Sequence, residues 1–209
     1  MLQLTFLSFT IYLTTGQLEV KTMGRKKSSD SLTRDIILEE ADRQLLQMDF
    51  QKVSMRSIGN ALGVSHGSIY YHFQSKEQLF NGVVEKYFTI LNDKLDAAIQ
   101  DKGNEGTKRL FLSFIEFGLN NQSQYDFMFV KQKGLDDPLQ QHAAKESLHK
   151  FIATVQTQQN NRLSDNVIHA SFIALHGFVL YYIGRVEDFE SAKNDAIEFV
   201  TIQLKTLGN

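Results

Sequence analysis

Three serines each stand directly before a short stretch of helical character, and a glycine separates the first two stretches. The side chains of Ser54, Ser65 and Ser75 can each accept a hydrogen bond from a backbone amide in the first turn of a helix. Gly63 can adopt the left-handed backbone conformation that ends a helix. Two short helices joined by a tight turn make a helix-turn-helix. We predict these two helices over residues 54–62 and 65–72.

The rest of the chain also shows the pattern of helices. Ile37, Ala41 and Leu45 recur every four residues, which is the period of one helix face. The chain has a single proline, and no long stretch alternates between apolar and polar residues. We therefore predict an all-α fold of about nine helices. The expected helices cover residues 33–48, 54–62, 65–72, 75–99, 107–120, 123–132, 137–159, 165–184 and 189–207.

The first 22 residues differ in character from the rest. Residues 1–18 carry no charge, but Thr, Ser and Gln interrupt them too often for a membrane-spanning helix. They also lack the basic start and small-residue cleavage site of a signal peptide. Met23 and the basic residues after it read like a natural start of the chain. We expect residues 1–22 to be a disordered extension.

Negative charge is missing from the stretch around the helix-turn-helix. Residues 50–76 contain no Asp or Glu, although the chain carries 24 acidic residues and a net charge of −2. Arg56 and Lys76 add positive charge there, and the helix N-termini offer backbone amides to anions. A carboxylate on this surface would repel the phosphates of DNA. The pattern therefore predicts a face that binds double-stranded DNA, with the second helix in the major groove.

Three motifs accompany this pattern. The turn reads Gly-Val-Ser at residues 63–65, the second helix ends in Tyr-Tyr-His-Phe at residues 70–73, and the next helix opens with Ser-Lys-Glu-Gln-Leu at residues 75–79. This set resembles the DNA-binding domain of the tetracycline-repressor-type (TetR/AcrR) family of transcriptional regulators. The resemblance implies a helix-turn-helix DNA-binding domain over residues 31–91. It also implies a larger helical domain for effector binding and dimerisation over residues 92–209.

The resemblance further implies which residues contact DNA. Those that lie at phosphate-contacting positions are Ser68, Tyr70, His72 and Lys76. Those that lie near base edges are Met55, Arg56, His66, Gly67 and Tyr71. The serines that begin the two short helices, Ser54 and Ser65, complete the predicted DNA-binding set.

Aromatic residues gather in the second half of the chain, with six of them within residues 111–129. They can form an ordinary aromatic core. They can also line a cavity for a small apolar or aromatic effector, as the family resemblance implies, with Tyr or His side chains to hold one polar group. His176-Gly177, four residues after Phe172, is similar to a Trp-x-x-x-His-Gly pattern of some family members, with Phe in place of Trp. The predicted ligand-binding residues are Phe114, Phe117, Tyr125, Phe127, His142, His176 and Tyr182.

We also predict a homodimer on a palindromic operator, because one recognition helix reads too few base pairs for specificity. The two last predicted helices, residues 165–184 and 189–207, are the expected interface. An apolar stripe along the first of them supports this, since a lone surface helix should not expose one. The predicted interface residues are Ile168, Phe172, Leu175 and Val179.

Several classes of site lack the residues they need. There is no cysteine, which removes disulfides, thiolate metal sites and cysteine nucleophiles and fits a cytoplasmic protein. The histidines of residues 142–176 form two pairs spaced by seven, whereas metal ligands on one helix prefer a spacing of four. No Gly-rich phosphate loop or Gly-x-Ser-x-Gly motif is present. We predict no catalytic residue, no metal, no cofactor and no enzymatic activity.

The function predicted from these features is a sequence-specific transcriptional regulator. We expect a repressor that a small apolar or aromatic ligand releases from its operator. The alternative is a DNA-binding adaptor or architectural factor that responds to no ligand. The two differ in the second domain, where a closed aromatic cavity would favour the first and a filled core the second.

Overall fold

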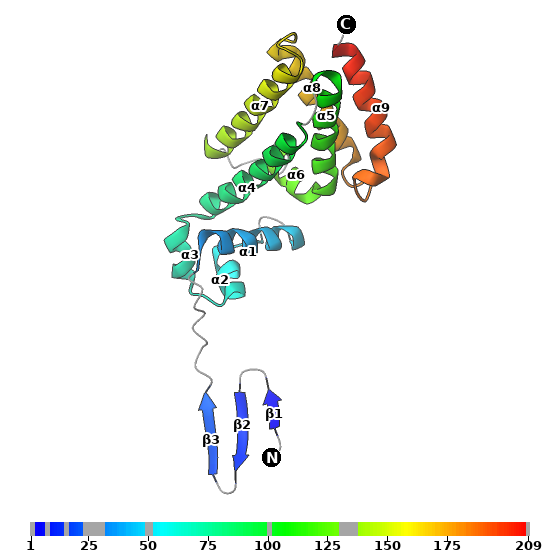
Figure 1. The fold of residues 1–209 in the computed structure, drawn as a ribbon. Helices are drawn as coiled ribbons and strands as arrows, with labels where there is room; N and C mark the ends of the chain where they lie inside the picture. Colours follow the sequence, from blue (N-terminus) through cyan, green and yellow to red (C-terminus); the bar gives the residue numbers. More distant parts are fainter. Residues whose placement is uncertain are drawn as a thin grey trace. The chain divides into compact units, whose positions relative to one another are not determined.

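The computed structural model describes residues 3–6, 9–14, 17–22, 32–48, 52–99, 102–129 and 138–207. The chain divides into two compact units, Met1–Thr33 and Arg34–Asn209. Nine helices lie in the described part of the second unit, which confirms the predicted all-α fold there (Figure 1).

The first unit contains three strands in place of the disordered extension expected from the sequence. They are β1 (Gln3–Phe6), β2 (Phe9–Thr14) and β3 (Gln17–Thr22). Each strand pairs antiparallel with the next, in the order β1-β2-β3. The Thr, Phe, Tyr, Ile, Leu and Val residues of this stretch explain the difference, because most of them favour extended backbone and need only local turns to pair.

The first three helices of the second unit begin and end where the local signals predict. The Ser54 Oγ accepts a hydrogen bond from the Ser57 amide at 3.0 Å, and the Ser57 Oγ accepts one from the Ser54 amide at 2.9 Å. This reciprocal pair is a capping box that begins the second helix. Gly63, with a φ of 67°, ends that helix in the left-handed conformation. The three helices are α1 (Arg34–Gln47), α2 (Met55–Leu62) and α3 (His66–His72).

These helices close around a small apolar core shared with the helix that follows. Ile58 of α2 and Ile69 and Phe73 at α3 are fully buried. These are among the few apolar side chains that α2 and α3 carry. Their burial stabilises both helices, because a helix of seven or eight residues is not stable by itself. The next helix, α4 (Lys76–Ala97), packs against α1 and leads from this group to the remaining helices (Figure 1).

The helix α5 lies at the centre of the larger helical group. It packs against α4 and against each of the other four helices (Figure 1). Its start differs from the sequence prediction, because the helix begins at Gly103 and not at residue 107. Gly106 and Thr107 are buried in this first turn, so packing offsets the poor helix propensity of glycine. The five helices are α5 (Gly103–Asn120), α6 (Gln122–Phe129), α7 (Pro138–Gln158), α8 (Asp165–Tyr182) and α9 (Phe189–Leu207).

One glycine permits the close packing of α5 against α8. A Cβ atom added at Gly118 would lie 2.5 Å from Cγ1 of Val179 and 3.1 Å from Cδ2 of Tyr125. Real side chains do not approach so closely, so the absent side chain is what lets these helices touch. Around this point Phe111, Phe114 and Phe151 form a buried aromatic core between α5 and α7.

Candidate nucleic-acid interface

The outer face of α3 presents polar and aromatic side chains. Tyr71 is 86% exposed and Tyr70 is 42% exposed, and His66 and Gly67 are also exposed. The rings of His66 and Tyr70 meet edge to face at 4.7 Å between centroids. Because Ile69 and the following Phe73 anchor the opposite side in the core, these groups are held on a short, fixed helix. Such a face can offer hydrogen bonds and apolar contacts to the edges of bases.

The predicted serine caps are formed, and they hold the helix starts on this surface. The Oγ of Ser65 accepts a hydrogen bond from the Ser68 amide at 3.1 Å and lies 2.7 Å from the Ser68 Oγ. The Ser75 Oγ accepts from the Gln78 amide at 3.1 Å at the start of α4. Ser54 is half-buried within its capping box. The helix N-termini, with their positive dipole ends, are therefore fixed near the exposed face of α3.

Positive charge flanks this face. Arg56 is exposed in the first turn of α2. Lys76, the first residue of α4, lies partly over the ring of Phe80 with its Nζ 5.6 Å from the ring centroid, and burial lowers the pKa of its ammonium group. His72 is half-buried at the end of α3. These three residues lie in α2, α3 and the start of α4.

Met55 differs from its predicted role near the base edges. Its side chain is only 4% exposed and belongs to the apolar core. The motif places Met55 directly after the Ser54 cap, and at that position the side chain turns inward to pack the start of α2. Of the predicted DNA-binding residues, Met55 is therefore the one that packing removes from the surface.

Arg34 is a surface cation that sequence reasoning did not assign to this site. Its Nη1 donates a hydrogen bond to the backbone oxygen of His72 at 2.6 Å. Its guanidinium carbon lies 4.0 Å from the ring centroid of Phe73. In the sequence Arg34 reads only as part of a basic stretch, since its partner is 38 residues away. The neighbouring basic residues 25–27 lie outside the described residues.

Comparison with known proteins places this geometry in a family. The family described as "Bacterial regulatory proteins, tetR family" matches residues 37–83, which run from α1 into α4 and contain the whole helix-turn-helix. The helix-turn-helix part of the chain matches the TetR family. The resemblance predicted from the motifs is thus confirmed.

Two curated TetR-family relatives show how far the sequence similarity extends. The "Probable acrEF/envCD operon repressor" of Escherichia coli (strain K12) is 37% identical over 60 residues, which cover 28% of this chain and 27% of the relative. The chain thus spans about a quarter of the length of that repressor. The "Nucleoid occlusion factor SlmA" of Glaesserella parasuis serovar 5 (strain SH0165) is 28% identical over 138 residues, covering 63% of this chain and 67% of the relative.

Solved structures show the same fold over most of the chain. A protein of unknown function from Rhodococcus sp. RHA1 has a TM-score of 0.71 at 19% identity, covering 88% of this chain and 97% of its own. SmeT, the repressor of the Stenotrophomonas maltophilia multidrug efflux pump SmeDEF, has a TM-score of 0.64 at 16% identity, covering 84% and 90%. The fold shared with these structures therefore includes the larger helical group as well as the helix-turn-helix.

Some of the predicted ligand-binding residues come together in the larger helical group and others do not. The ring of Phe114 packs edge to face on Tyr125, whose hydroxyl lies 2.7 Å from Nδ1 of His176. Burial lowers the pKa of His176 and raises that of Tyr125, so the pair is a neutral polar contact among aromatic rings. Phe172 stacks parallel to His176 and completes the cluster.

The other predicted ligand-binding residues lie apart from this cluster. Phe117 is buried in α5, and Phe127 packs edge to face against Phe80 of α4. His142 is exposed on α7. The hydroxyl of Tyr182 donates to Asp195 of α9, which raises the pKa of that tyrosine to about 12. The sequence alone could not show that these residues lie apart from the cluster, because it does not show which neighbouring element each side chain meets.

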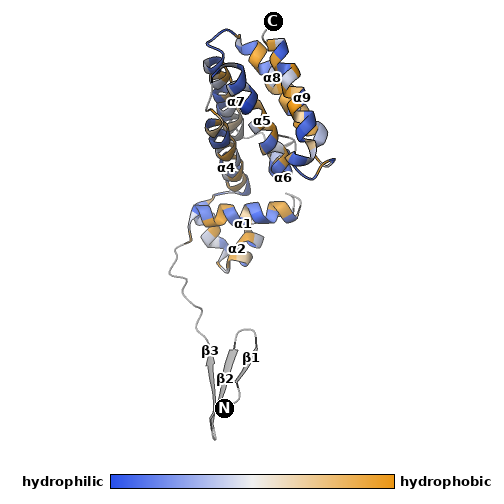
Figure 2. Cartoon of the chain, turned by 45° about the vertical axis from the view of Figure 1, so that its right-hand side comes forward, coloured by the Kyte–Doolittle hydropathy of each residue, from blue (hydrophilic) through white to orange (hydrophobic). Residues whose placement is uncertain are grey.

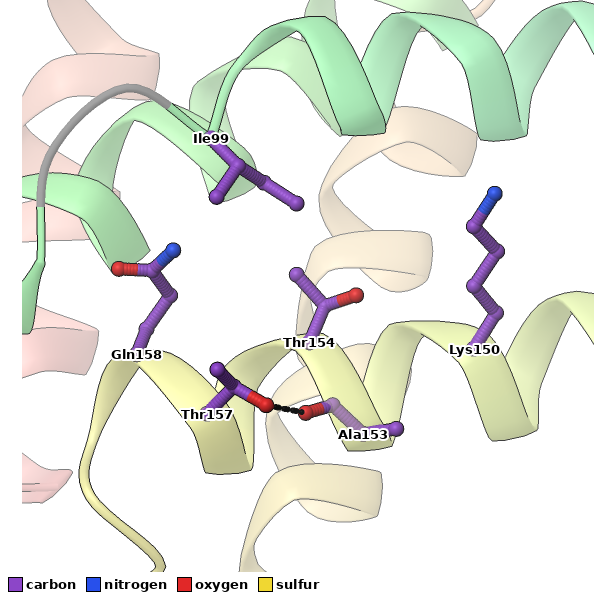
Figure 3. A pocket seen from close by; sticks show the side chains of 6 residues that line it. All are labelled: Ile99, Lys150, Ala153, Thr154, Thr157 and Gln158. Carbon is purple, nitrogen blue, oxygen red and sulfur yellow. Dashed lines mark hydrogen bonds between the residues drawn. The ribbon is translucent and has the colours of Figure 1, made fainter.

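A shallow groove of about 210 Å³ lies beside the C-terminal end of α4. Figure 3 shows its walls, Ile99 after α4 and the last turns of α7. Gln158 in its wall is only 2% exposed, and its Oε1 has no hydrogen-bond partner. The Thr157 Oγ1 beside it donates to the Ala153 oxygen at 2.9 Å. None of the predicted ligand-binding residues lines this groove.

The predicted interface stripe of α8 is buried inside the protomer. Ile168, Leu175 and Val179 are fully buried, and Phe172 packs on Phe114 and Phe151. The first three side chains are therefore not available to a second copy, and Phe172 is only partly exposed. The same helices expose a different apolar set. Its members are Val167, Ile173 and Tyr181 on α8 and Ile197 and Ile202 on α9. Figure 2 shows that hydrophobic residues recur along both α8 and α9.

The described residues contain neither a metal-binding cluster nor a membrane-spanning helix. Within them, no group of three or more His, Cys, Asp or Glu side chains is placed to hold a metal ion. No helix of the described part of the chain combines the length and apolar character needed to cross a membrane.

Proposed function

We propose that this chain is a sequence-specific DNA-binding transcriptional regulator that acts as a repressor. The observation that carries the proposal is the outer face of α3, which presents His66, Gly67, Tyr70 and Tyr71 to solvent on a helix fixed by the core. Around it stand the cations of Arg56 and Lys76 and no acidic side chain from residues 50–76. Polar and aromatic side chains such as those of α3 read base edges, and cations such as Arg56 and Lys76 bind phosphates.

The names of similar proteins support repression as the outcome of binding. The Escherichia coli relative is named an operon repressor, and SmeT is named the repressor of an efflux pump. The chain is 37% identical to the first over 60 residues and shares its fold with the second over 84% of its length. Occupation of an operator by such a domain would exclude the transcription machinery from it.

Salt dependence of DNA binding tests the proposal. A duplex selected from a randomised pool by the wild-type protein serves as the operator, and a random duplex serves as the non-specific control. We expect Lys76→Ala to weaken binding to both and to reduce the slope of log affinity against log salt by about one, as for one lost phosphate contact. Lys150→Ala is the matched control, because Lys150 lies on α7 and pairs with Asp96 at 2.6 Å. Failure of the wild-type protein to enrich any sequence would refute the proposed function.

The proposed DNA-binding form is a homodimer joined through α8 and α9. Apolar residues lie on both the buried and the exposed faces of α8, and a helix that is apolar all round is one that is covered on all sides. Ile173 is 57% exposed and Tyr181, two turns later, is 61% exposed, so both lie on the uncovered face. A second copy of the same surface would cover it. The two recognition helices would then read half-sites about one helical turn, roughly 34–36 Å, apart.

Light scattering on a size-exclusion column tests the dimer. We expect a dimeric mass for the wild-type protein and a monomeric mass for Ile173→Glu, since a carboxylate would be buried in the interface. Ile90→Glu is the matched control, because Ile90 is 46% exposed on α4, outside the proposed interface. A monomeric wild-type protein at micromolar concentration would contradict this part of the proposal.

The proposed effector is a small apolar or aromatic molecule that binds beside the Tyr125–His176 pair. In the neutral tautomer of His176 that carries its proton on Nε2, Nδ1 accepts the hydrogen bond from the Tyr125 hydroxyl. That Nε2–H is a donor for one polar group of a ligand, and the rings of Phe114, Phe129 and Phe172 supply apolar area. A ligand that favours one tilt of α4 would change the separation of the recognition helices.

Thermal-shift screening followed by DNA titration tests the effector. A panel of apolar and aromatic compounds is screened with the wild-type protein and with His176→Ala. We expect a hit to lower DNA affinity by about 5–150-fold, which corresponds to a coupling of about 1–3 kcal/mol. If a compound binds beside His176 and leaves DNA affinity unchanged, the proposed regulation by a ligand is refuted. The protein would then be the ligand-independent DNA-binding adaptor.

A further inference from the structure

The C-terminal end of α3 is held by a residue from a distant part of the chain. α3 has only seven residues, and the last carbonyls of a helix have no partner within it. The carbonyl of His72, its final residue, accepts a hydrogen bond from Nη1 of Arg34 at 2.6 Å. The guanidinium also lies 4.0 Å from the ring centroid of Phe73, the fully buried residue that ends α3.

The chemistry of this contact suits it to hold the end of α3 in place, and we call the contact of Arg34 with His72 and Phe73 the clamp. A hydrogen bond from a cation to a carbonyl is stronger than one between neutral groups. Positive charge beside the C-terminus of a helix interacts favourably with the helix dipole. The planar guanidinium can also lie over an aromatic face, which a flexible ammonium does less well. Arg34 is itself the first residue of α1, so it joins the start of that helix to the end of α3, 38 residues away in the sequence.

We propose that Arg34 is a positioning residue that fixes the orientation of α3 for base recognition. This inference rests on the proposed DNA-binding function of the α3 face. Two anchors hold α3 from other directions, namely the Ser65 cap at its start and the buried side chain of Ile69 in its middle. The last turn, which carries Tyr71 and His72, is followed by the buried ring of Phe73. Arg34 adds a second restraint at that end, because it holds the carbonyl of His72 and lies over the ring of Phe73.

A positioning role differs in its consequences from a plain phosphate contact. Loss of a phosphate contact weakens binding to all sequences about equally and lowers the salt slope by about one. Loss of the clamp lets the end of α3 move, which weakens contacts with base edges more than contacts with the backbone. The ratio of operator affinity to random-duplex affinity is therefore the quantity that separates the two roles.

The experiment measures that ratio for three variants. The operator is again the duplex selected from a randomised pool by the wild-type protein. We expect Arg34→Met to lower the ratio about tenfold, as for the loss of one specific base contact. Arg34→Lys keeps a donor and a charge and should recover part of the loss. Arg43→Met is the matched control, because Arg43 lies on the same helix, carries the same charge and bonds only to Glu40 and Gln47 in the described contacts.

Three results of these titrations would overturn the proposal. One is an unchanged ratio in Arg34→Met. Another is an equal loss on both duplexes together with a lower salt slope, which would make Arg34 a phosphate contact only. The third is an Arg34→Lys variant that falls as far as Arg34→Met, since the hydrogen bond to His72 would then not be the cause.

Amide hydrogen exchange on the free protein provides a readout that needs no DNA. The Phe73 amide donates to the Ile69 oxygen at 3.0 Å, which is the last hydrogen bond of α3. We expect Arg34→Met to raise the exchange rates of the amides of residues 70–73 at least several-fold, and Arg43→Met to leave them unchanged. Unchanged rates in Arg34→Met would overturn the clamp. If the wild-type protein selects no duplex, the proposed function fails while the exchange rates still decide what Arg34 does.

Discussion

Replacement of Gly67 by Ala should stabilise the free protein and at the same time weaken its binding to DNA. Gly67 lies in the first turn of α3, on the exposed face. A Cβ atom added there meets only the Ser65 Oγ, at 3.8 Å, within 4 Å. The free protein therefore has room for the methyl group. Only a molecule that packs against the bare backbone of α3 would meet it.

The gain in stability follows from helix propensity. Alanine is more favourable than glycine within a helix by about 0.5–1 kcal/mol, largely because glycine loses more conformational freedom on folding. For a unit of this size, about 1 kcal/mol corresponds to a rise in Tm of roughly 2–4 °C. Since Gly67 stands at the second position of α3, we expect about 0.5 kcal/mol and a rise of about 1–2 °C.

The loss of DNA affinity follows from the depth at which α3 would enter the major groove. If the backbone at Gly67 approaches a base edge, the added methyl group forces α3 away from the bases. Loss of one good set of base contacts costs about 1–3 kcal/mol of discrimination, or about 5–150-fold in affinity for the operator. Binding to random duplexes should fall much less, because it depends on phosphate contacts.

Gly59→Ala is the matched control. Gly59 is buried in α2, and an added Cβ would make ordinary van der Waals contacts with the Val64 oxygen at 3.4 Å and with Cγ1 of Ile69 at 3.5 Å. We expect this variant to be more stable by about 0.5–1 kcal/mol with unchanged DNA affinity. Thermal unfolding and fluorescence-anisotropy titration measure the two quantities. A Gly67→Ala protein that binds the operator as tightly as the wild type would refute the close approach of α3.

Three further outcomes are expected. Gly118→Ala should lower the free energy of unfolding by about 1–3 kcal/mol in urea, because its Cβ would lie 2.5 Å from Cγ1 of Val179; wild-type stability would contradict the close packing of α5 on α8. Tyr87→Phe should lower it by about 2 kcal/mol, because the Asp42 carboxylate loses the donor that joins α4 to α1, and an unchanged urea midpoint would show that water replaces it. Burial lowers the pKa of His176 below its ordinary 6.5, so the unfolded chain binds the proton first and stability should fall as the pH drops below about 6.5. His176→Gln should flatten this dependence in thermal unfolding, and a fall in stability that survives the substitution would assign it to other groups.

Much of the N-terminal half could be predicted because its signals are local. A serine oxygen that caps a helix bonds an amide three residues away, and Gly63 ends α2 through its own φ of 67°. Such interactions depend only on neighbouring residues, so Ser54 and Ser65 placed α2 and α3 correctly from the sequence alone. The spacing of the motifs was then sufficient to predict the family resemblance.

The side on which a residue faces could not be predicted in the same way. Met55 was expected near base edges, but it packs into the core at the start of α2. Ile168 and Leu175 form a regular apolar stripe that fits a core or a partner equally well, and burial against α5 and α7 makes it core. An apolar period shows that a face is covered without showing what covers it.

The sequence by itself determined where α2, α3 and α4 begin, that the first two are arranged as a helix-turn-helix, and that residues 50–76 carry no acidic side chain. The tertiary structure alone decided which contacts join distant segments. Tyr125 reaches His176 across 51 residues, and Arg34 reaches His72 across 38. These contacts depend on how whole helices pack, and the geometry of that packing is set by many side chains at once. Local signals act over one helical turn, so they carry no information about which distant carbonyl or ring a side chain will meet.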